Sequence, residues 1–236
     1  MTRREEAGPK AHDLVDVRLL EAMREGGCPV CVVRSRAERG VVETIIRERV
    51  LDRGFRADLE RREGFCRRHV VELVAADRRE TGGILGASLL LAAIIDRRTT
   101  GLADTVGTGR RTVRSRVKAA RVRPPCVACT NGATAAETAR TRLAERAEHD
   151  DWAVALADSP LCLDDLLALW ETAGSAKAFE PVARAQLARF GGIHDRLEAY
   201  AHHSSQDRRH LLTDEERTAA DDATRALGGT KRADPS

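Results

Sequence analysis

The chain has 236 residues, of which 42% are hydrophobic and 33% are charged, and its formal net charge is +3. This balance is typical of a globular protein, and it excludes a largely disordered chain and a polycation. The longest apolar stretch, Ile84 to Ile95, is shorter than the roughly 20 residues that a membrane-spanning helix needs. The charged segment Met1–Lys10 is followed by no apolar region, which argues against a secretory signal. We therefore expect a cytoplasmic protein with no membrane association.

The first half of the chain shows helical periodicity throughout. Apolar residues from Leu14 onward line one face of a helix that ends at Gly26-Gly27. Pro29 suits the first position of a second helix running toward Val50. Further helices are expected over about 52–62, from Cys66 to before Gly82, and over the apolar segment 84–95.

The second half repeats this pattern after a basic connection. Gly101–Pro125 contains glycines, prolines and seven basic residues but no acid after Asp104, and it is interpreted as a linker. Thr213 and Glu216 form a capping box that opens the last helix. The predicted fold is all-α, with an N-terminal helical repeat over 12–105, a basic linker over 106–125 and a C-terminal helical repeat over 126–229.

Six cysteines support this internal duplication. Cys28 and Cys31 form a CxxC pair, followed after 34 residues by Cys66 and then His69. In the second half, Cys126 and Cys129 are followed after 32 residues by Cys162 and then Asp165. The halves read CxxC–x34–CxxH and CxxC–x32–CxxD, with a period of about 97 residues.

The residue types in each half are those of a zinc site. A CxxC pair supplies two sulfurs from one turn of backbone, and a Cys-x-x-His pair places two further donors on one helical face. Both pairs fall at predicted helix N-termini, whose partial positive charge favours the thiolate. The sequence therefore predicts that Cys28, Cys31, Cys66 and His69 bind one zinc ion as a Cys3His site.

The second half predicts a weaker site made of Cys126, Cys129, Cys162 and Asp165. A Cys3Asp donor set is uncommon for zinc. Two other interpretations stay open: His149 or His194 replaces Asp165 as a ligand, or the three cysteines pack as small apolar residues.

Other cysteine chemistries are weighed against zinc. Structural disulfides are disfavoured in the cytosol, and a redox CxxC of the thioredoxin type expects a βαβ pattern that is not visible here. An iron–sulfur cluster is the alternative cofactor, although three cysteines and one histidine are a less usual ligand set. A Cys66–His69 nucleophilic pair is a further alternative, but the neighbouring CxxC favours a ligand role.

The basic run Arg110–Arg123 is compatible with contacts to phosphate backbones, through Arg110, Arg111, Arg114 and Arg116 among others. It contains no aromatic residue for base stacking, so a solvated linker is the preferred interpretation.

The motifs resemble a prokaryotic domain-of-unknown-function family. The resemblance is carried by Gly27-Cys28-Pro29-Val30-Cys31, by Gly64-Phe65-Cys66-Arg67-Arg68-His69, and by the second CxxC followed by Leu161-Cys162. It extends from about Leu14 to Gly229, and it implies an all-helical chain with duplicated metal-binding cysteine motifs. In that family the second motif usually ends in histidine, whereas Asp165 stands here.

The favoured function at this point is a non-enzymatic, zinc-binding helical protein that acts through an unknown protein partner. A fully coordinated site leaves no open position for water, which argues against a hydrolase. The alternatives are a nucleic-acid-binding regulator that uses the basic linker, and a thiol-redox or iron–sulfur protein. The sequence does not indicate an oligomeric state.

Overall fold

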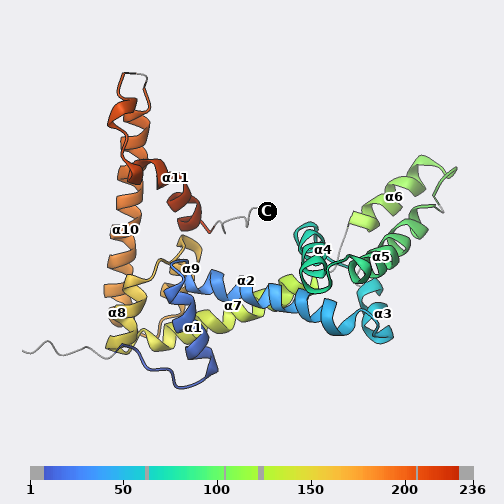
Figure 1. The fold of residues 1–236 in the computed structure, drawn as a ribbon, viewed down its shortest axis with the longest axis horizontal. Helices are drawn as coiled ribbons and strands as arrows, with labels where there is room; N and C mark the ends of the chain where they lie inside the picture. The colour runs from blue at the N-terminus through green and yellow to red at the C-terminus, as the bar shows by residue number, and fades with distance from the viewer. Residues whose placement is uncertain (1–7, 62–63, 104, 122–124, 206, 229–236) are drawn as a thin grey trace, which may run out of the picture. The chain divides into compact units, whose positions relative to one another are not determined.

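The computed structural model describes residues 8–61, 64–103, 105–121, 125–205 and 207–228. Within these residues the secondary structure is entirely helical, with no strand, which confirms the all-α class (Figure 1). The helices are α1 (Leu14–Arg24), α2 (Pro29–Thr44), a π-helical turn (Ile45–Arg49), α3 (Arg53–Arg61), α4 (Arg67–Thr81), α5 (Leu85–Ala103), α6 (Arg110–Arg121), α7 (Val127–Arg146), α8 (Asp150–Asp158), α9 (Leu163–Thr172), α10 (Ala176–His203), a 3-10 turn (Arg209–Leu211) and α11 (Asp214–Ala226).

The helices begin and end where local chemistry dictates. The side chain of Asp13 accepts a hydrogen bond from the Asp16 N–H and caps α1, and Thr213 and Glu216 form the predicted capping box of α11. Gly82 ends α4 with a φ of +74°, a left-handed conformation that glycine adopts without strain. Cys66 and Cys162 stand in extended conformation immediately before α4 and α9.

The chain forms two compact units. Unit 1 consists of the described residues of Met1–Arg34 and Ala135–Ser236, and unit 2 consists of the described residues of Ser35–Thr134. These units differ from the predicted repeats, because α2 and α7 each contribute their first and last residues to different units. The predicted boundaries at 105 and 126 followed sequence order, whereas the compact units join segments that are distant in the sequence.

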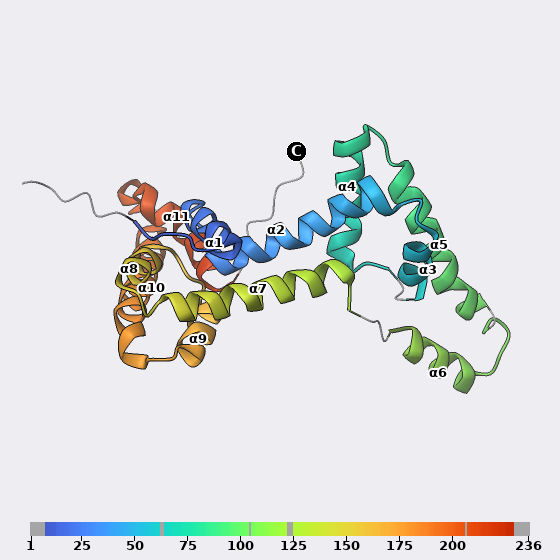
Figure 2. The same cartoon turned by 90° about the horizontal axis from the view of Figure 1, so that it is seen from below.

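In unit 1, the start of α2 packs with the end of α7. The core joins Val30 to Ala136, Ala139 and Leu143, and it continues into the buried apolar side chains of α8, α9 and α10. Figure 2 shows α8, α9 and α10 gathered around the end of α7. The buried Asp16 carboxylate accepts a hydrogen bond of 2.6 Å from Nη2 of Arg146, which ties α1 to α7.

In unit 2, the end of α2 packs with the start of α7. Val42 and Ile45 meet Ala128, and the core extends to Leu73 of α4 and Leu90 of α5. The cysteine motifs lie at the edges of these two cores, so each unit places its own set of sulfurs beside buried apolar side chains.

The two halves of the chain share an order of helices. In each half a long helix follows the CxxC pair, and a helix of 9 residues, α3 or α8, precedes the next cysteine. The internal duplication itself stays a prediction. None of the helices in the described residues is long and apolar enough to cross a membrane.

Candidate metal centres

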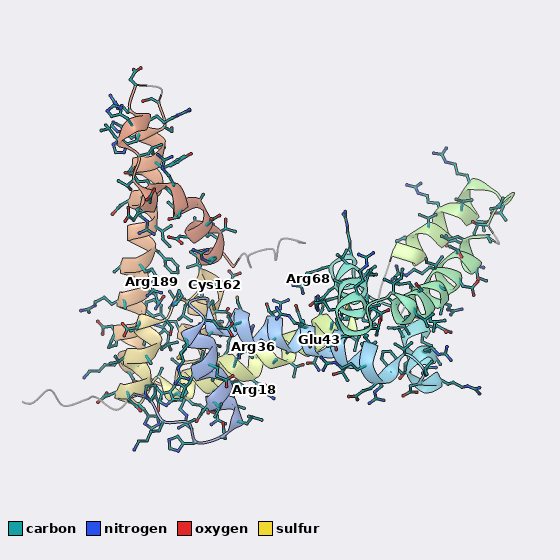
Figure 3. The ribbon with its side chains drawn as sticks, viewed as in Figure 1. Arg18, Arg36, Glu43, Arg68, Cys162 and Arg189 are labelled. Atoms are coloured by element: carbon teal, nitrogen blue, oxygen red, sulfur yellow. The ribbon has the colours of Figure 1, made fainter. Side chains whose placement is uncertain are left out.

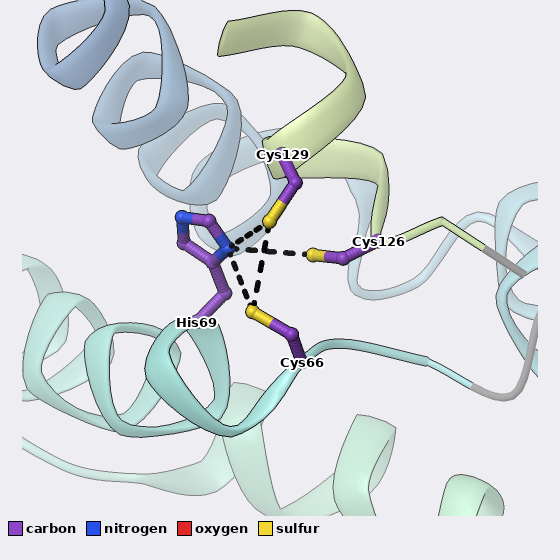
Figure 4. A group of neighbouring side chains, drawn as sticks. All are labelled: Cys66, His69, Cys126 and Cys129. Atoms are coloured by element: carbon purple, nitrogen blue, oxygen red, sulfur yellow. Dashed lines mark hydrogen bonds between the residues drawn. The ribbon is translucent and has the colours of Figure 1, made fainter. Parts of the chain in front are cut away.

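Unit 2 contains a cluster of Cys66, His69, Cys126 and Cys129, here called the Cys3His cluster (Figure 4). Nδ1 of His69 lies 3.2 Å from Sγ of Cys66, 3.4 Å from Sγ of Cys126 and 3.3 Å from Sγ of Cys129. The sulfurs of Cys66 and Cys129 are 3.7 Å apart, and all four donor atoms lie within 4.8 Å of one another.

These distances are those between the corners of a zinc tetrahedron. With Zn–S bonds of about 2.3 Å and a Zn–N bond of about 2.0 Å, tetrahedral geometry requires edges of about 3.8 Å between sulfurs and about 3.5 Å between sulfur and nitrogen. The four donors are therefore spaced for one ion. An iron–sulfur cluster would divide the same ligands between separate iron atoms and hold them farther apart.

Helix N-termini deliver both donor pairs to this cluster. Cys66 precedes α4 and His69 lies in its first turn, while Cys126 precedes α7 and Cys129 lies in its first turn. The carbonyls of Cys66 and Cys126 each accept a hydrogen bond of 2.9 Å from an N–H of the first helical turn. Each cluster cysteine thus lies beside the partial positive charge of a helix N-terminus, which by itself favours thiolate.

The other imidazole nitrogen faces buried acid. Nε2 of His69 lies 3.5 Å from Oε2 of Glu38, whose side chain is 3% exposed, and 3.6 Å from a carboxylate oxygen of Glu72. Arg68 forms an ion pair with the same Glu38 oxygen. A carboxylate against the second nitrogen holds the ring so that Nδ1 points at the three sulfurs, the orientation that a ligand would need.

Gly132 makes room for Glu38. A Cβ atom at Gly132 would lie 2.7 Å from Oε1 and 2.8 Å from Cδ of Glu38, closer than carbon packing permits. Sequence analysis missed both residues, because an acid and a glycine within helices carry no metal-ligand signal.

We expect Glu38→Gln and Gly132→Ala each to weaken zinc binding at the Cys3His cluster by about 10- to 100-fold, the usual cost of losing the partner of a ligating histidine. Competition with a zinc chelator measures the affinity. Glu43→Gln and Gly40→Ala are matched controls on α2, since a Cβ at Gly40 meets no atom within 4 Å. Equal effects of the variants and their controls would show that Glu38 does not orient His69.

The thiols of the Cys3His cluster ionise unequally in the metal-free protein. Burial raises the pKa of Cys126, but hydrogen bonds from His69 and from backbone N–H groups outweigh it and lower the pKa to about 6. Burial and the neighbouring Cys66 thiol raise the pKa of Cys129 to about 12. For His69, burial lowers the pKa, but the hydrogen bond with Cys126 prevails and raises it.

The metal-free protein is therefore expected to show one thiolate absorbance transition with a midpoint near pH 6. Because the pKa of Cys126 is lower in the folded than in the unfolded chain, its ionisation stabilises the metal-free fold. This contribution is fully present above the ordinary thiol pKa of about 9 and is lost as the pH falls through about 6. Ultraviolet titration measures the transition, which Cys126→Ser should abolish and His69→Gln should move to higher pH. A transition that survives Cys126→Ser would assign it to another thiol.

Unit 1 contains a second cluster of Cys28, Cys31, Cys162 and Asp165, here called the Cys3Asp cluster. Oδ2 of Asp165 lies 3.2 Å from Sγ of Cys28, 3.4 Å from Sγ of Cys31 and 3.0 Å from Sγ of Cys162. The sulfurs of Cys31 and Cys162 are 3.8 Å apart, which again matches a tetrahedral edge of about 3.8 Å.

The carboxylate of Asp165 divides its two oxygens between the sulfurs and an arginine. Oδ2 faces the three thiols, while Oδ1 accepts a hydrogen bond of 3.1 Å from Nε of Arg140. Arg140 also forms an ion pair with Glu137. Arg140 thus holds Asp165 in the orientation that a ligand needs, as Glu38 does for His69.

The thiols of the Cys3Asp cluster are all protonated at neutral pH in the metal-free protein. The hydrogen bond with Cys162 raises the pKa of Cys31 to about 12, and the hydrogen bond with Cys28 raises the pKa of Cys162. For Cys28, the hydrogen bond with Cys162 lowers the pKa, but the Cys31 thiol and burial together raise it. Metal binding here must displace three thiol protons, a larger cost than at the Cys3His cluster.

Gln186 of α10 fixes the loop that carries Cys162. Its fully buried side chain accepts a hydrogen bond of 3.1 Å from the Leu161 N–H and donates to the carbonyls of Leu156, Ala157 and Ser159 at 2.9–3.2 Å. A cavity of about 180 Å³ adjoins this loop and is lined by Cys28, Cys162 and Arg189 among others; Figure 3 labels Cys162 and Arg189.

Comparison with known proteins supports the expected resemblance. The model of a family of unknown function, DUF6062, matches residues 11–146, more than half of the chain. The chain belongs to this family. No curated protein and no solved structure matches it.

The DUF6062 match is shorter than the resemblance expected from Leu14 to Gly229. It includes all of unit 2 and every donor of the Cys3His cluster. Of the Cys3Asp cluster it includes only Cys28 and Cys31, because Cys162 and Asp165 lie beyond residue 146.

The structure groups the predicted ligands differently from the sequence analysis. Cys66 and His69 lie with Cys126 and Cys129, not with Cys28 and Cys31. The reason is helix length. From Pro29 to Arg49 the helical segment spans about 30 Å, whereas the 9 residues of α3 span about 14 Å. Before Cys66, α3 therefore retraces less than half of the preceding helical segment, and α8 is likewise less than half as long as α7 before Cys162.

The two histidines considered as replacements for Asp165 are not part of either cluster. His149 occupies the N-cap position of α8, and His194 lies exposed on α10 beside Asp195 and Glu198. Asp165 itself stands among the sulfurs.

The predicted linker contains a helix. Arg110, Arg111, Arg114 and Arg116 lie on α6, a helix of 12 residues, and their side chains are exposed. Arg123, the end of the predicted basic run, lies outside the described residues.

Proposed function

We propose that this DUF6062 protein is a non-enzymatic zinc protein that binds one ion in each unit and acts through protein interaction. The observation that carries the proposal is the spacing of the four donors of the Cys3His cluster, which corresponds to one tetrahedral ion. Four protein donors complete the coordination of zinc and leave no position for a catalytic water. The ion would then act as a structural cross-link between the N-termini of α4 and α7.

Zinc is favoured over iron by the donors and by the buried surroundings. Tetrahedral sulfur and nitrogen ligands suit zinc, and a carboxylate beside the second imidazole nitrogen, as Glu38 is here, is a common partner of a zinc-bound histidine. All six cysteines are free thiols gathered in the two clusters, which suits a protein of a reducing compartment such as the cytoplasm.

Elemental analysis of the purified full chain tests this function. We expect two zinc ions per chain and a colourless protein. Iron with visible absorption in anaerobically purified protein would instead establish the iron–sulfur alternative. Full-length protein that folds and contains no metal after purification in zinc-replete medium would overturn the proposal.

The non-enzymatic part of the proposal is tested separately with the zinc-loaded protein. Hydrolase and thiol-transfer substrates should not be turned over, and all six cysteines should resist alkylation while zinc is bound. Rapid alkylation of Cys66 in the zinc-loaded chain would favour the nucleophilic alternative.

A further inference from the structure

The α6 helix concentrates positive charge that neither metal centre uses. No acidic residue occurs between Thr105 and Ala136. Within this stretch, α6 exposes five cationic side chains, those of Arg110, Arg111, Arg114, Arg116 and Lys118.

These cations have no acidic partner in the part of the chain that the structure describes. Exposed arginines elsewhere do pair, as Arg47 with Glu80 and Arg184 with Glu180. No such ion pair engages the five cations of α6 among the described side chains. Repulsion among these cations lowers the stability of the folded chain, and no ion pair among the described side chains offsets it. An anionic partner would remove this repulsion.

Four of the five cations lie along one side of the helix. At about 100° per residue, Arg110, Arg111, Arg114 and Lys118 fall within a stripe about 100° wide. Among the described side chains of this helix, Val113 and Val117 are half-buried, and α6 packs against α5 (Figure 2). The stripe is about 12 Å long from Arg110 to Lys118, and it lies beside the valines, centred about 90° from them around the helix axis.

The residue types distinguish between anionic partners. A membrane-binding helix needs a broad apolar face of large side chains, and among its described side chains α6 offers two half-buried valines. Single-stranded nucleic acid is bound by aromatic stacking, and no aromatic residue occurs in α6. The major groove of B-DNA admits an α-helix, whereas the deep, narrow groove of A-form RNA does not.

We propose that α6 binds the phosphate backbone of double-stranded DNA without sequence specificity, through the stripe of Arg110, Arg111, Arg114 and Lys118. Arginine suits this task because its guanidinium donates two parallel hydrogen bonds to one phosphate. DNA binding of this kind uses the side chains of α6 and none of the residues in the two metal clusters. It therefore goes beyond the proposed zinc function.

Fluorescence anisotropy with a labelled DNA duplex of about 20 base pairs tests the proposal on the full, zinc-loaded chain. The logarithm of the binding constant should fall linearly with the logarithm of salt concentration, with a slope of about −0.9 per phosphate contacted. The triple variant Arg110→Gln, Arg114→Gln, Lys118→Gln should weaken binding by about tenfold or more at low salt and flatten the slope by about 2.7. Glutamine keeps the helix, since its helix propensity is close to that of arginine and lysine.

The matched control removes the same charge elsewhere. Arg53, Arg184 and Arg217 are exposed on α3, α10 and α11, and their joint change to glutamine should leave the slope unchanged. Equal losses in both triple variants would overturn the proposal, as would undetectable binding at low salt. Tighter binding to anionic vesicles, RNA duplex or single strands than to duplex DNA would overturn it as well. Zinc content measured on the same samples keeps this outcome separate from the fate of the zinc sites.

Discussion

Replacing Cys66 with serine is expected to reduce the zinc content from two ions per chain to one and to lower the free energy of unfolding by several kcal/mol. Structural zinc contributes on the order of 10 kcal/mol to folding, and a serine hydroxyl is a poor substitute for a thiolate. The loss falls on unit 2, whose helices α4 and α7 meet at this cluster. Elemental analysis and denaturant unfolding at fixed free zinc measure both effects.

Double variants test the grouping of the ligands directly. If Cys28 and Cys66 lie in different centres, as the structure shows, Cys28→Ser with Cys66→Ser removes both ions. Cys66→Ser with Cys126→Ser then serves as the matched control and removes only one, because both sulfurs belong to the Cys3His cluster. The opposite pattern would restore the grouping expected from sequence order.

The local structure was predictable because it depends on neighbouring residues. Pro29 at the start of α2, Gly82 after α4 and the Thr213–Glu216 capping box each produce the feature that their sequence pattern indicates. The pairs Cys66/His69 and Cys162/Asp165 were predicted as units for the same reason, since three residues on a helix place two side chains on one face.

The joining of these pairs was not predicted, although the sequence contains part of the necessary signal. A helix expected from Pro29 toward Val50 is about twice as long as the one expected over 52–62, so the second helix alone does not bring the chain back to the same place. Because the cysteine motifs repeat, the sequence suggested one site in each half. The difference in length between the two expected helices was not taken into account.

The residues around the ligands lay beyond sequence reasoning. Glu38 and Arg140 are separated from His69 and Asp165 by more than 20 residues, and each is of a type usually found on a helix surface. Only the fold shows that both are directed at a ligand. Gln186 is similar, because a buried glutamine that bonds four backbone groups has no local pattern.

The basic segment illustrates competing local signals. Glycines and prolines at its ends indicated a linker, and they do lie outside α6. Between Arg110 and Arg121 the chain has neither residue, and its arginines, lysine and alanines favour a helix.

The two centres differ by one charge, and the surrounding residues offset that difference. Zinc with three thiolates and a neutral imidazole carries a net charge of minus one, whereas zinc with three thiolates and a carboxylate carries minus two. Arg140, bonded to Asp165, compensates for the additional negative charge. Glu38 stands against His69 in the other centre, where an acid suits the imidazole N–H.

Asp165→Ala is therefore expected to weaken zinc binding in unit 1 by at least the 10- to 100-fold that loss of an outer partner costs, while unit 2 keeps its ion. The fall in folding stability should be smaller than for Cys66→Ser. Zinc binding at the Cys3Asp cluster must displace three thiol protons, so its net contribution to the free energy of unfolding is smaller. Chelator competition and native mass spectrometry measure the two ions separately. Asp164→Ala is the matched control, because Asp164 is an exposed acid in the same first turn of α9.

The Asp165→His variant tests whether Arg140 favours a carboxylate over an imidazole as the fourth donor of the Cys3Asp cluster. Histidine alone places an imidazole against the Arg140 guanidinium, so we expect the single variant to gain little affinity for zinc. Adding Arg140→Gln removes that repulsion, and the double variant should bind zinc more tightly than Asp165→His by about tenfold or more. In the Asp165 background, Arg140→Gln should have the opposite effect and weaken binding. This reversal of sign is the decisive result, because an arginine with a purely structural role would change both backgrounds in the same direction.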